Sequence, residues 1–142
     1  MDIMELFENL DTFIIVNSST LKNNGDKYIN YAIYDNGEDI SSVVVSYLKD
    51  KKVNYIELDL TKEDDLNIDL SILANDLINN KACLLIKNYG MIDNSIRTKF
   101  EAIINFRKVG DIKVNYLGTI VFMNKNKYKL DIDEQGYFKL LR

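Results

Sequence analysis

Residues 106–125 read FRKVGDIKVNYLGTIVFMNK. The stretch opens on the basic pair Arg107 and Lys108 and turns at Gly110. Alternating polar and apolar residues then predict a ribbon, and the apolar run at 118–123 predicts a buried strand that ends at Asn124. A second unbroken apolar run, ACLLI at residues 82–86, is typical of an interior strand in an α/β sheet.

Helical patterns lie between these strands and before them. Apolar residues recur at helical spacing in segments 40–51, 68–79 and from Asn94 or Ser95 to about Phe106, while VNYIELDL at 53–60 alternates like a half-buried strand. Strands that alternate with helices of this length predict parallel βαβ units. We therefore expect an α/β fold with a mostly parallel sheet and helices on both faces, as one domain over residues 1–142.

The two ends of the chain carry different signals. Residues 2–10 have the spacing of a short amphipathic helix, and the β-rich run at 12–21 is followed by Asn-Asn-Gly-Asp at 23–26 and by YINYAIY at 28–34. Asn-Gly is a strong hairpin signal, so a hairpin is predicted over 12–34. A second, closing hairpin is predicted from strands at 128–132 and 137–141, so antiparallel hairpins are expected at each end of the sheet.

Composition excludes several chemistries. The 142 residues include no histidine and one cysteine, and the net charge is -4. Imidazole catalysis, His-ligated metals, intrachain disulfides and Cys-rich zinc sites are thereby excluded. The acidic balance argues against a nucleic-acid partner, because phosphate neutralisation normally requires a basic surface. No apolar run approaches the length of a membrane span, and the acidic start lacks signal-peptide features, so we expect a cytoplasmic protein without a membrane partner.

The order of the predicted elements carries a resemblance to a known family. VNYIELDLTKEDD at 53–65 is similar to the second-strand region of MoxR-like AAA+ ATPases, where an acidic loop follows. The segment at 82–125 is similar to their stretch from Walker B to sensor 1, in which Asn124 keeps the sensor-1 identity. The resemblance implies a truncated P-loop or AAA+ core; a generic α/β domain that shares only the alternation remains the alternative.

The phosphate-loop slot departs from the family pattern. The turn before the predicted helix at 40–51 reads AIYDNGED. Gly37 matches the last glycine of the motif, but Glu38 stands where a lysine should be and Asp39 where serine or threonine should be. A phosphate loop needs that lysine for the phosphates and the hydroxyl for magnesium. These carboxylates, with Asp35, would repel a triphosphate.

The Walker B slot departs as well. The apolar run at 82–86 ends in Lys87 and Asn88, where Walker B requires two carboxylates. A charged lysine cannot ligate magnesium, and asparagine is no general base. We therefore assign no catalytic, cofactor-binding or metal-binding residue and expect no cofactor.

Charged residues supply a candidate interface instead. Asp64 and Asp65 belong to an acidic cluster, whereas Arg107, Lys108 and Lys113 belong to a basic stretch that begins at Arg97. In an AAA+ ring, the basic residues that follow the helix before sensor 1 contact the neighbouring subunit. Here that helix is the one expected to end at about Phe106. The resemblance thus implies a head-to-tail contact between copies in a ring or stack, and ordinary surface charge is the alternative.

Together these observations predict a non-catalytic structural or protein-interaction subunit built on a pseudo-ATPase-like core. Because MoxR-like relatives accompany multi-subunit machines, the resemblance implies a phage or phage-tail-like assembly. Two alternatives stay open: an atypical nucleotide-binding protein of the NTPase type, and a small monomeric regulator that binds a host or partner protein.

Overall fold

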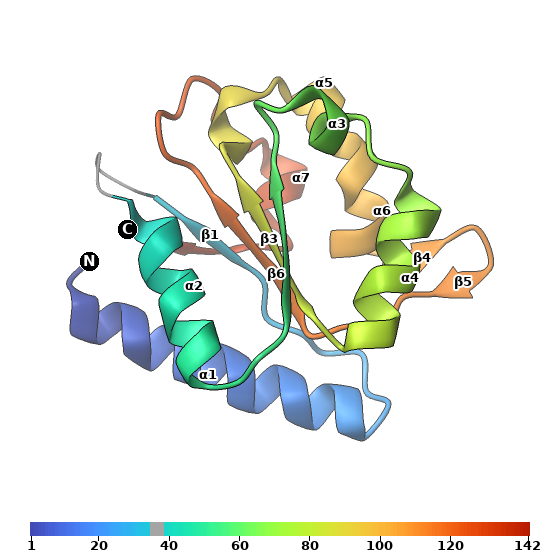
Figure 1. The fold of residues 1–142 in the computed structure, drawn as a ribbon. Coiled ribbons are helices and arrows are strands. Elements are labelled where there is room, and N and C mark those ends of the chain that lie inside the picture. The colour runs from blue at the N-terminus through green and yellow to red at the C-terminus, as the bar shows by residue number, and fades with distance from the viewer. Residues whose placement is uncertain (35–38) are drawn as a thin grey trace.

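The computed structural model describes residues 1–34 and 39–142. At its centre is a five-stranded sheet in the order β2-β3-β6-β1-β7, and every neighbouring pair of strands is parallel (Figure 1). The strands are β1 (Tyr31–Ile33), β2 (Tyr55–Asp59), β3 (Cys83–Lys87), β6 (Gly118–Phe122) and β7 (Lys139–Leu141). The predicted α/β class with a mostly parallel sheet is confirmed.

Helices cover both faces of this sheet. Helices α1 (Ile3–Lys22) and α2 (Ile40–Asp50) pack on one face, where Leu10 and Leu48 meet Tyr31 and Leu85. The other face is covered by α4 (Leu70–Asn80), α5 (Asn94–Arg97), η2 (Thr98–Phe100), α6 (Glu101–Ile104) and α7 (Ile132–Gln135). The short elements α3 (Glu63–Leu66) and η1 (Tyr89–Met91) follow the ends of β2 and β3.

Two of the three interior strands, β3 and β6, are those predicted from unbroken apolar runs, and the third, β1, lies in the segment predicted as a hairpin. β3 lies between β2 and β6, and β6 is the middle strand of the sheet. Alternate side chains of β3 enter the two cores: Cys83 and Leu85 contact the α1/α2 side, whereas Leu84 and Ile86 contact the opposite side. Both faces of these strands are buried, which is why no polar residue alternates along them. The arrangement is compatible with a truncated P-loop-like core.

The hairpin predicted over 12–34 is wrong. One helix, α1, runs through the β-rich segment to Lys22, and its buried side chains fall at helical spacing at Leu6, Leu10, Phe13 and Asn17. Packing of this stripe on the sheet overrides the weak helix propensity of the β-branched residues. The Asn-Gly sequence closes the helix, since the Gly25 amide donates to the Thr20 carbonyl at 2.8 Å.

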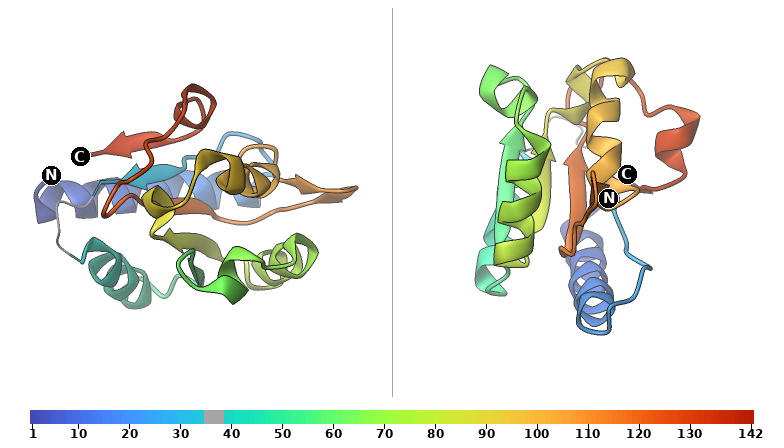
Figure 2. Two further views of the ribbon diagram at one scale, coloured as in Figure 1. Left: turned by 90° about the horizontal axis from the view of Figure 1, so that it is seen from above. Right: turned by 90° about the vertical axis from the view of Figure 1, so that its right-hand side faces the viewer.

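The closing hairpin is also wrong. Residues predicted as its turn form α7, whose capping box joins the Asp131 carboxylate to the Glu134 amide and the Glu134 carboxylate to the Asp131 amide. After α7 the chain crosses over and β7 pairs with β1 in parallel. Within the described residues the antiparallel pairing is that of β4 (Lys108–Val109) with β5 (Ile112–Lys113), a ribbon that extends from the body of the molecule (Figure 2).

Candidate functional site

The carboxyl ends of the strands meet along one edge of the sheet, called here the carboxyl edge (Figure 1). Open α/β sheets bind ligands at this edge, where neighbouring strands lead to opposite faces. Here β1 leads to α2 on one face, and its neighbour β6 leads to α7 on the other. The predicted phosphate-loop slot falls at this point, although Asp35, Gly37 and Glu38 lie outside the described residues.

Asp39 occupies the N-terminus of α2. One carboxylate oxygen accepts hydrogen bonds from the Ser41 hydroxyl at 2.7 Å and the Ser42 amide at 3.2 Å, and the other accepts from the Ser42 hydroxyl at 2.5 Å. These bonds, led by that of the Ser42 hydroxyl, lower the pKa of Asp39. The helix terminus that would attract an anion therefore already holds a carboxylate of this chain.

The end of β3 carries an ion pair. The Lys87 ammonium lies 3.3 Å from the Glu57 carboxylate, and both side chains are about one-third exposed. The pair borders a hollow of about 240 Å³ that is also lined by Ser41, Ser42 and Ser46 of α2. Lys87, a cation neutralised by Glu57, thus occupies a position where Walker B would have a carboxylate.

The adjacent acidic residues serve the local structure. The Asn88 side-chain amide donates to the Asp59 carboxylate at 2.8 Å, and the Asp65 carboxylate accepts from the Asp59 amide at 2.9 Å. Burial raises the pKa of Asp59, but hydrogen bonds from Thr61 and Asn88 outweigh burial and lower it overall. In the parts of the chain that are described, no group of three or more His, Cys, Asp or Glu residues could hold a metal ion.

Asn124 follows β6 at the same edge. Its side-chain oxygen is buried and accepts no hydrogen bond from any residue in 1–34 or 39–142. The lone cysteine, Cys83, is fully buried in β3, and burial raises its pKa. It therefore lacks the exposed, electropositive setting of a reactive thiol.

Arg107, the first residue of the predicted basic interface, is packed into the fold. Its guanidinium carbon lies 3.4 Å from the ring centroid of Tyr28 and 4.0 Å from that of Tyr116, and one guanidinium nitrogen donates to the Tyr116 carbonyl. Burial lowers the pKa of Arg107. This arginine joins the chain before β1 to the chain before β6, and most of it is not available to a partner.

The other predicted interface residues are placed differently. Lys108 and Lys113 are exposed and face each other across the β4–β5 ribbon. Asp64 is exposed on α3, and Asp65 is partly buried. Within one chain the structure does not bring these groups together: α3 follows the carboxyl end of β2, whereas the ribbon leads to the amino end of β6 (Figure 1).

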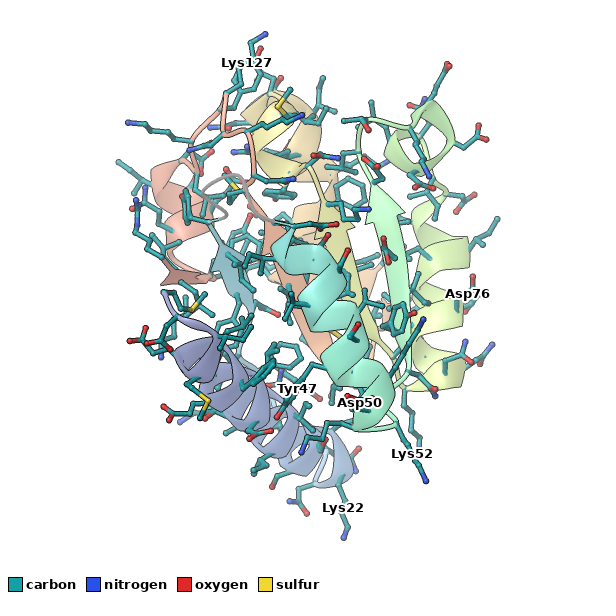
Figure 3. The ribbon with its side chains drawn as sticks, turned by 60° about the vertical axis from the view of Figure 1, so that its left-hand side comes forward. Lys22, Tyr47, Asp50, Lys52, Asp76 and Lys127 are labelled. Carbon is teal, nitrogen blue, oxygen red and sulfur yellow. The ribbon has the colours of Figure 1, made fainter. Side chains whose placement is uncertain are left out.

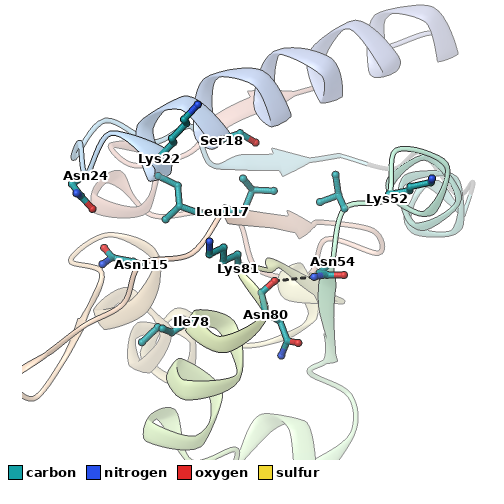
Figure 4. Close-up of a pocket in the computed structure, with 12 residues that line it drawn as sticks. Ser18, Lys22, Asn24, Lys52, Asn54, Ile78, Asn80, Lys81, Asn115 and Leu117 are labelled. Carbon is teal, nitrogen blue, oxygen red and sulfur yellow. Dashed lines mark hydrogen bonds between the residues drawn. The ribbon is translucent and has the colours of Figure 1, made fainter.

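A larger hollow, about 690 Å³, lies at the amino edge of the sheet and was not predicted. Lys22, Lys52 and Lys81 line it from three segments that are far apart in the sequence (Figure 4). The sequence feature that could have indicated this hollow is a lysine at or just after the end of each of three helices, α1, α2 and α4.

Asp39 gives a pH-dependent prediction. We expect Asp39→Ala to lower the free energy of unfolding by about 1 kcal/mol at pH 7 through loss of the helix cap. Because the folded-state pKa of Asp39 is lowered, its stabilisation is present above the unfolded pKa of about 3.9 and is lost as the pH falls through the folded pKa. Urea unfolding at pH 7 and at about pH 3 measures the difference. Asp39→Ser, a cap without charge, is the control, and an effect of Asp39→Ala that is unchanged at low pH contradicts the assignment.

Comparison with known proteins adds no relative. No protein-family model matches the chain, and a search of curated proteins finds no match. In residues 1–34 and 39–142, none of the helices combines the length and apolar character needed to cross a bilayer.

Proposed function

We propose that this protein is a non-catalytic structural or interaction subunit of a multi-protein assembly, built on a pseudo-ATPase-like core. The observation that carries the proposal is the Asp39 carboxylate at the N-terminus of α2, hydrogen-bonded to Ser41 and Ser42. An anion already fixed there opposes binding of a triphosphate by like-charge repulsion. Lys87, paired with Glu57, adds a cation where magnesium would need a carboxylate.

The sheet order supports the resemblance to a degenerate MoxR-like core. The strand in the Walker B slot, β3, is interior, and the strand that leads to Asn124, β6, lies beside it. A phage or phage-tail-like particle is the setting that this resemblance favours, and the protein's place in it is that of a scaffold rather than a motor.

The β4–β5 ribbon is the contact surface that we propose. Lys108 and Lys113 are directly opposite each other, and like charges in that position repel. Phe106 at the base of the ribbon is 66% exposed, and Ile112 is 41% exposed. An acidic partner surface would remove the repulsion and cover these apolar side chains, and α3 of another copy, with Glu63 and Asp64, supplies such a surface.

Calorimetric titration with ATP and magnesium tests the non-catalytic role. We expect no saturable binding at micromolar ATP and no release of phosphate. Micromolar binding with turnover would overturn the proposal in favour of an NTPase.

Charge reversal tests the contact surface. The double variant Lys108→Glu/Lys113→Glu is expected to dissociate an assembly of the purified protein, because two attractive contacts per interface become repulsive. Light scattering measures the molar mass. Lys127→Glu/Lys129→Glu makes the same charge change at exposed sites of the carboxyl edge, and this control should leave the mass unchanged. A monomer already in the unmodified protein would favour the regulatory alternative, and equal masses for both variants would refute this contact.

A further inference from the structure

The hollow at the amino edge continues into a second one of about 490 Å³, with which it shares Lys52, Val53, Asn54 and Asn80. We call the joined surface the amino-edge groove. It contains four lysines and no carboxylate, although the chain as a whole carries a net charge of -4. The lysines are Lys22, Lys49, Lys52 and Lys81.

Helix ends account for only part of this charge. Helices α1, α2 and α4 all end beside the groove, and each C-terminus contributes roughly half a negative charge, about -1.5 in total. The four positive charges of the lysines outweigh this negative charge by more than two units. Neutralising the helix ends therefore does not require all of them, and a net positive groove remains.

Three lining residues hold unusual backbone conformations. Asn24, Lys52 and Lys81 have φ values of 54°, 58° and 47°, in the left-handed region where glycine is favoured. A side chain there costs about 1 kcal/mol relative to glycine. Two of these three positions, Lys52 and Lys81, carry a lysine that lines the groove, so glycine is expected to fit the backbone there at least as well.

The remaining lining selects the kind of ligand. Leu21, Val53 and Ile78 supply apolar contact surface, and the side chains of Asn24 and Asn115 supply amide donors and acceptors. The side-chain amides of Asn54 and Asn80 already donate to the Asn80 and Asp76 carbonyls, each at 2.9 Å, and keep their oxygens as acceptors. The lining contains no arginine, and the adjacent helices present carbonyl ends rather than free amides. The lining therefore offers neither an arginine fork nor a helix N-terminus to one compact anion, and its separate lysines among apolar and amide groups suit an extended acidic peptide.

We propose that the amino-edge groove binds an acidic peptide segment of a partner protein, whose carboxylates meet the lysines, whose backbone meets the asparagine amides and whose apolar side chains meet Val53 and Ile78. The inference rests on the proposed interaction role and extends it, because it adds a peptide site at the edge of the sheet opposite the nucleotide slot.

Fluorescence anisotropy of the full chain with a labelled hexapeptide of alternating glutamate and leucine, at low ionic strength, tests the site. The unmodified protein is expected to bind this peptide and to bind a glutamine–leucine version much more weakly. Lys52→Gly/Lys81→Gly removes two cations at left-handed positions, so affinity should fall about 2- to 30-fold while the melting temperature stays constant or rises.

A matched control separates the groove from general charge. Figure 3 shows Lys22 and Lys52 at one end of the molecule and Lys127 at the other. Lys127→Ala/Lys129→Ala removes the same charge at that other end and should leave peptide affinity within twofold. Failure of the glutamate peptide to bind overturns the proposal, as does equal weakening by both double variants. Stronger binding of pyrophosphate or oligothymidine than of the peptide would assign the groove to phosphates and also overturn it.

The same samples distinguish this proposal from the broader one. ATP turnover would overturn the non-catalytic role at the carboxyl edge without changing peptide binding. Absence of peptide binding together with absence of ATP turnover would overturn the peptide site at the amino-edge groove and leave the non-catalytic role standing.

Discussion

Replacing Glu134 with alanine is expected to lower the free energy of unfolding by about 3–5 kcal/mol. The Glu134 carboxylate lies 2.5 Å from the Arg97 guanidinium, and the two side chains are 3% and 0% exposed. Removal of the carboxylate leaves a buried arginine without a counterion, which is far less favourable than removal of both charges. Urea unfolding measures the loss.

The effect should be large because Arg97 joins several segments. It donates hydrogen bonds to the carbonyl oxygens of Tyr89, Ile92, Tyr128 and Lys129, and the Tyr89 hydroxyl donates to Glu134 at 2.9 Å. The pair therefore connects η1 and α5 to the chain that leads to α7. Glu134→Gln is the control: its side-chain oxygen can still accept from Arg97 and Tyr89, so it should be more stable than Glu134→Ala. A single-variant loss below about 1 kcal/mol, as for an exposed pair, would contradict this assignment.

Gly118→Ala is expected to destabilise the protein by about 2–5 kcal/mol. Gly118 begins β6 with a φ of +121°, a conformation that L-amino acids with a side chain rarely adopt. A Cβ atom at this position would lie 2.6 Å from the side-chain nitrogen of Asn17 and 3.2 Å from the Ile29 carbonyl. Thermal and urea unfolding would both report the loss.

The clash matters because its neighbours are fixed. The buried side chain of Asn17 donates to the Ile29 carbonyl at 2.9 Å and accepts from the Ile29 amide at 2.8 Å, which ties α1 to the chain entering β1. Gly110→Ala is the matched control: its φ is +59°, and a Cβ atom there would have no neighbour within 4 Å. That variant should cost about 1 kcal/mol from backbone strain alone. Equal losses at both glycines would show that the predicted clash relaxes freely.

The departures from the phosphate-loop and Walker B motifs could be predicted from the sequence, because they depend on residue type and local position. Asp39 directly precedes the helix expected at 40–51, and its carboxylate caps that helix. The role of Arg107 was not readable in this way, since its stacking partners Tyr28 and Tyr116 belong to segments that only the fold brings together. The amino-edge groove was missed for the same reason.

The sequence by itself determined two of the interior strands of the sheet. Apolar runs at 82–86 and 118–123 became β3 and β6, because strands buried on both faces need apolar residues at every position. Only the tertiary structure decided the two ends. The segment at 12–21 has a local preference for strand, yet it is helical in α1 because the Leu10–Phe13 stripe is buried on the sheet. Likewise β7 is parallel to β1 because α7 carries the chain across before it pairs.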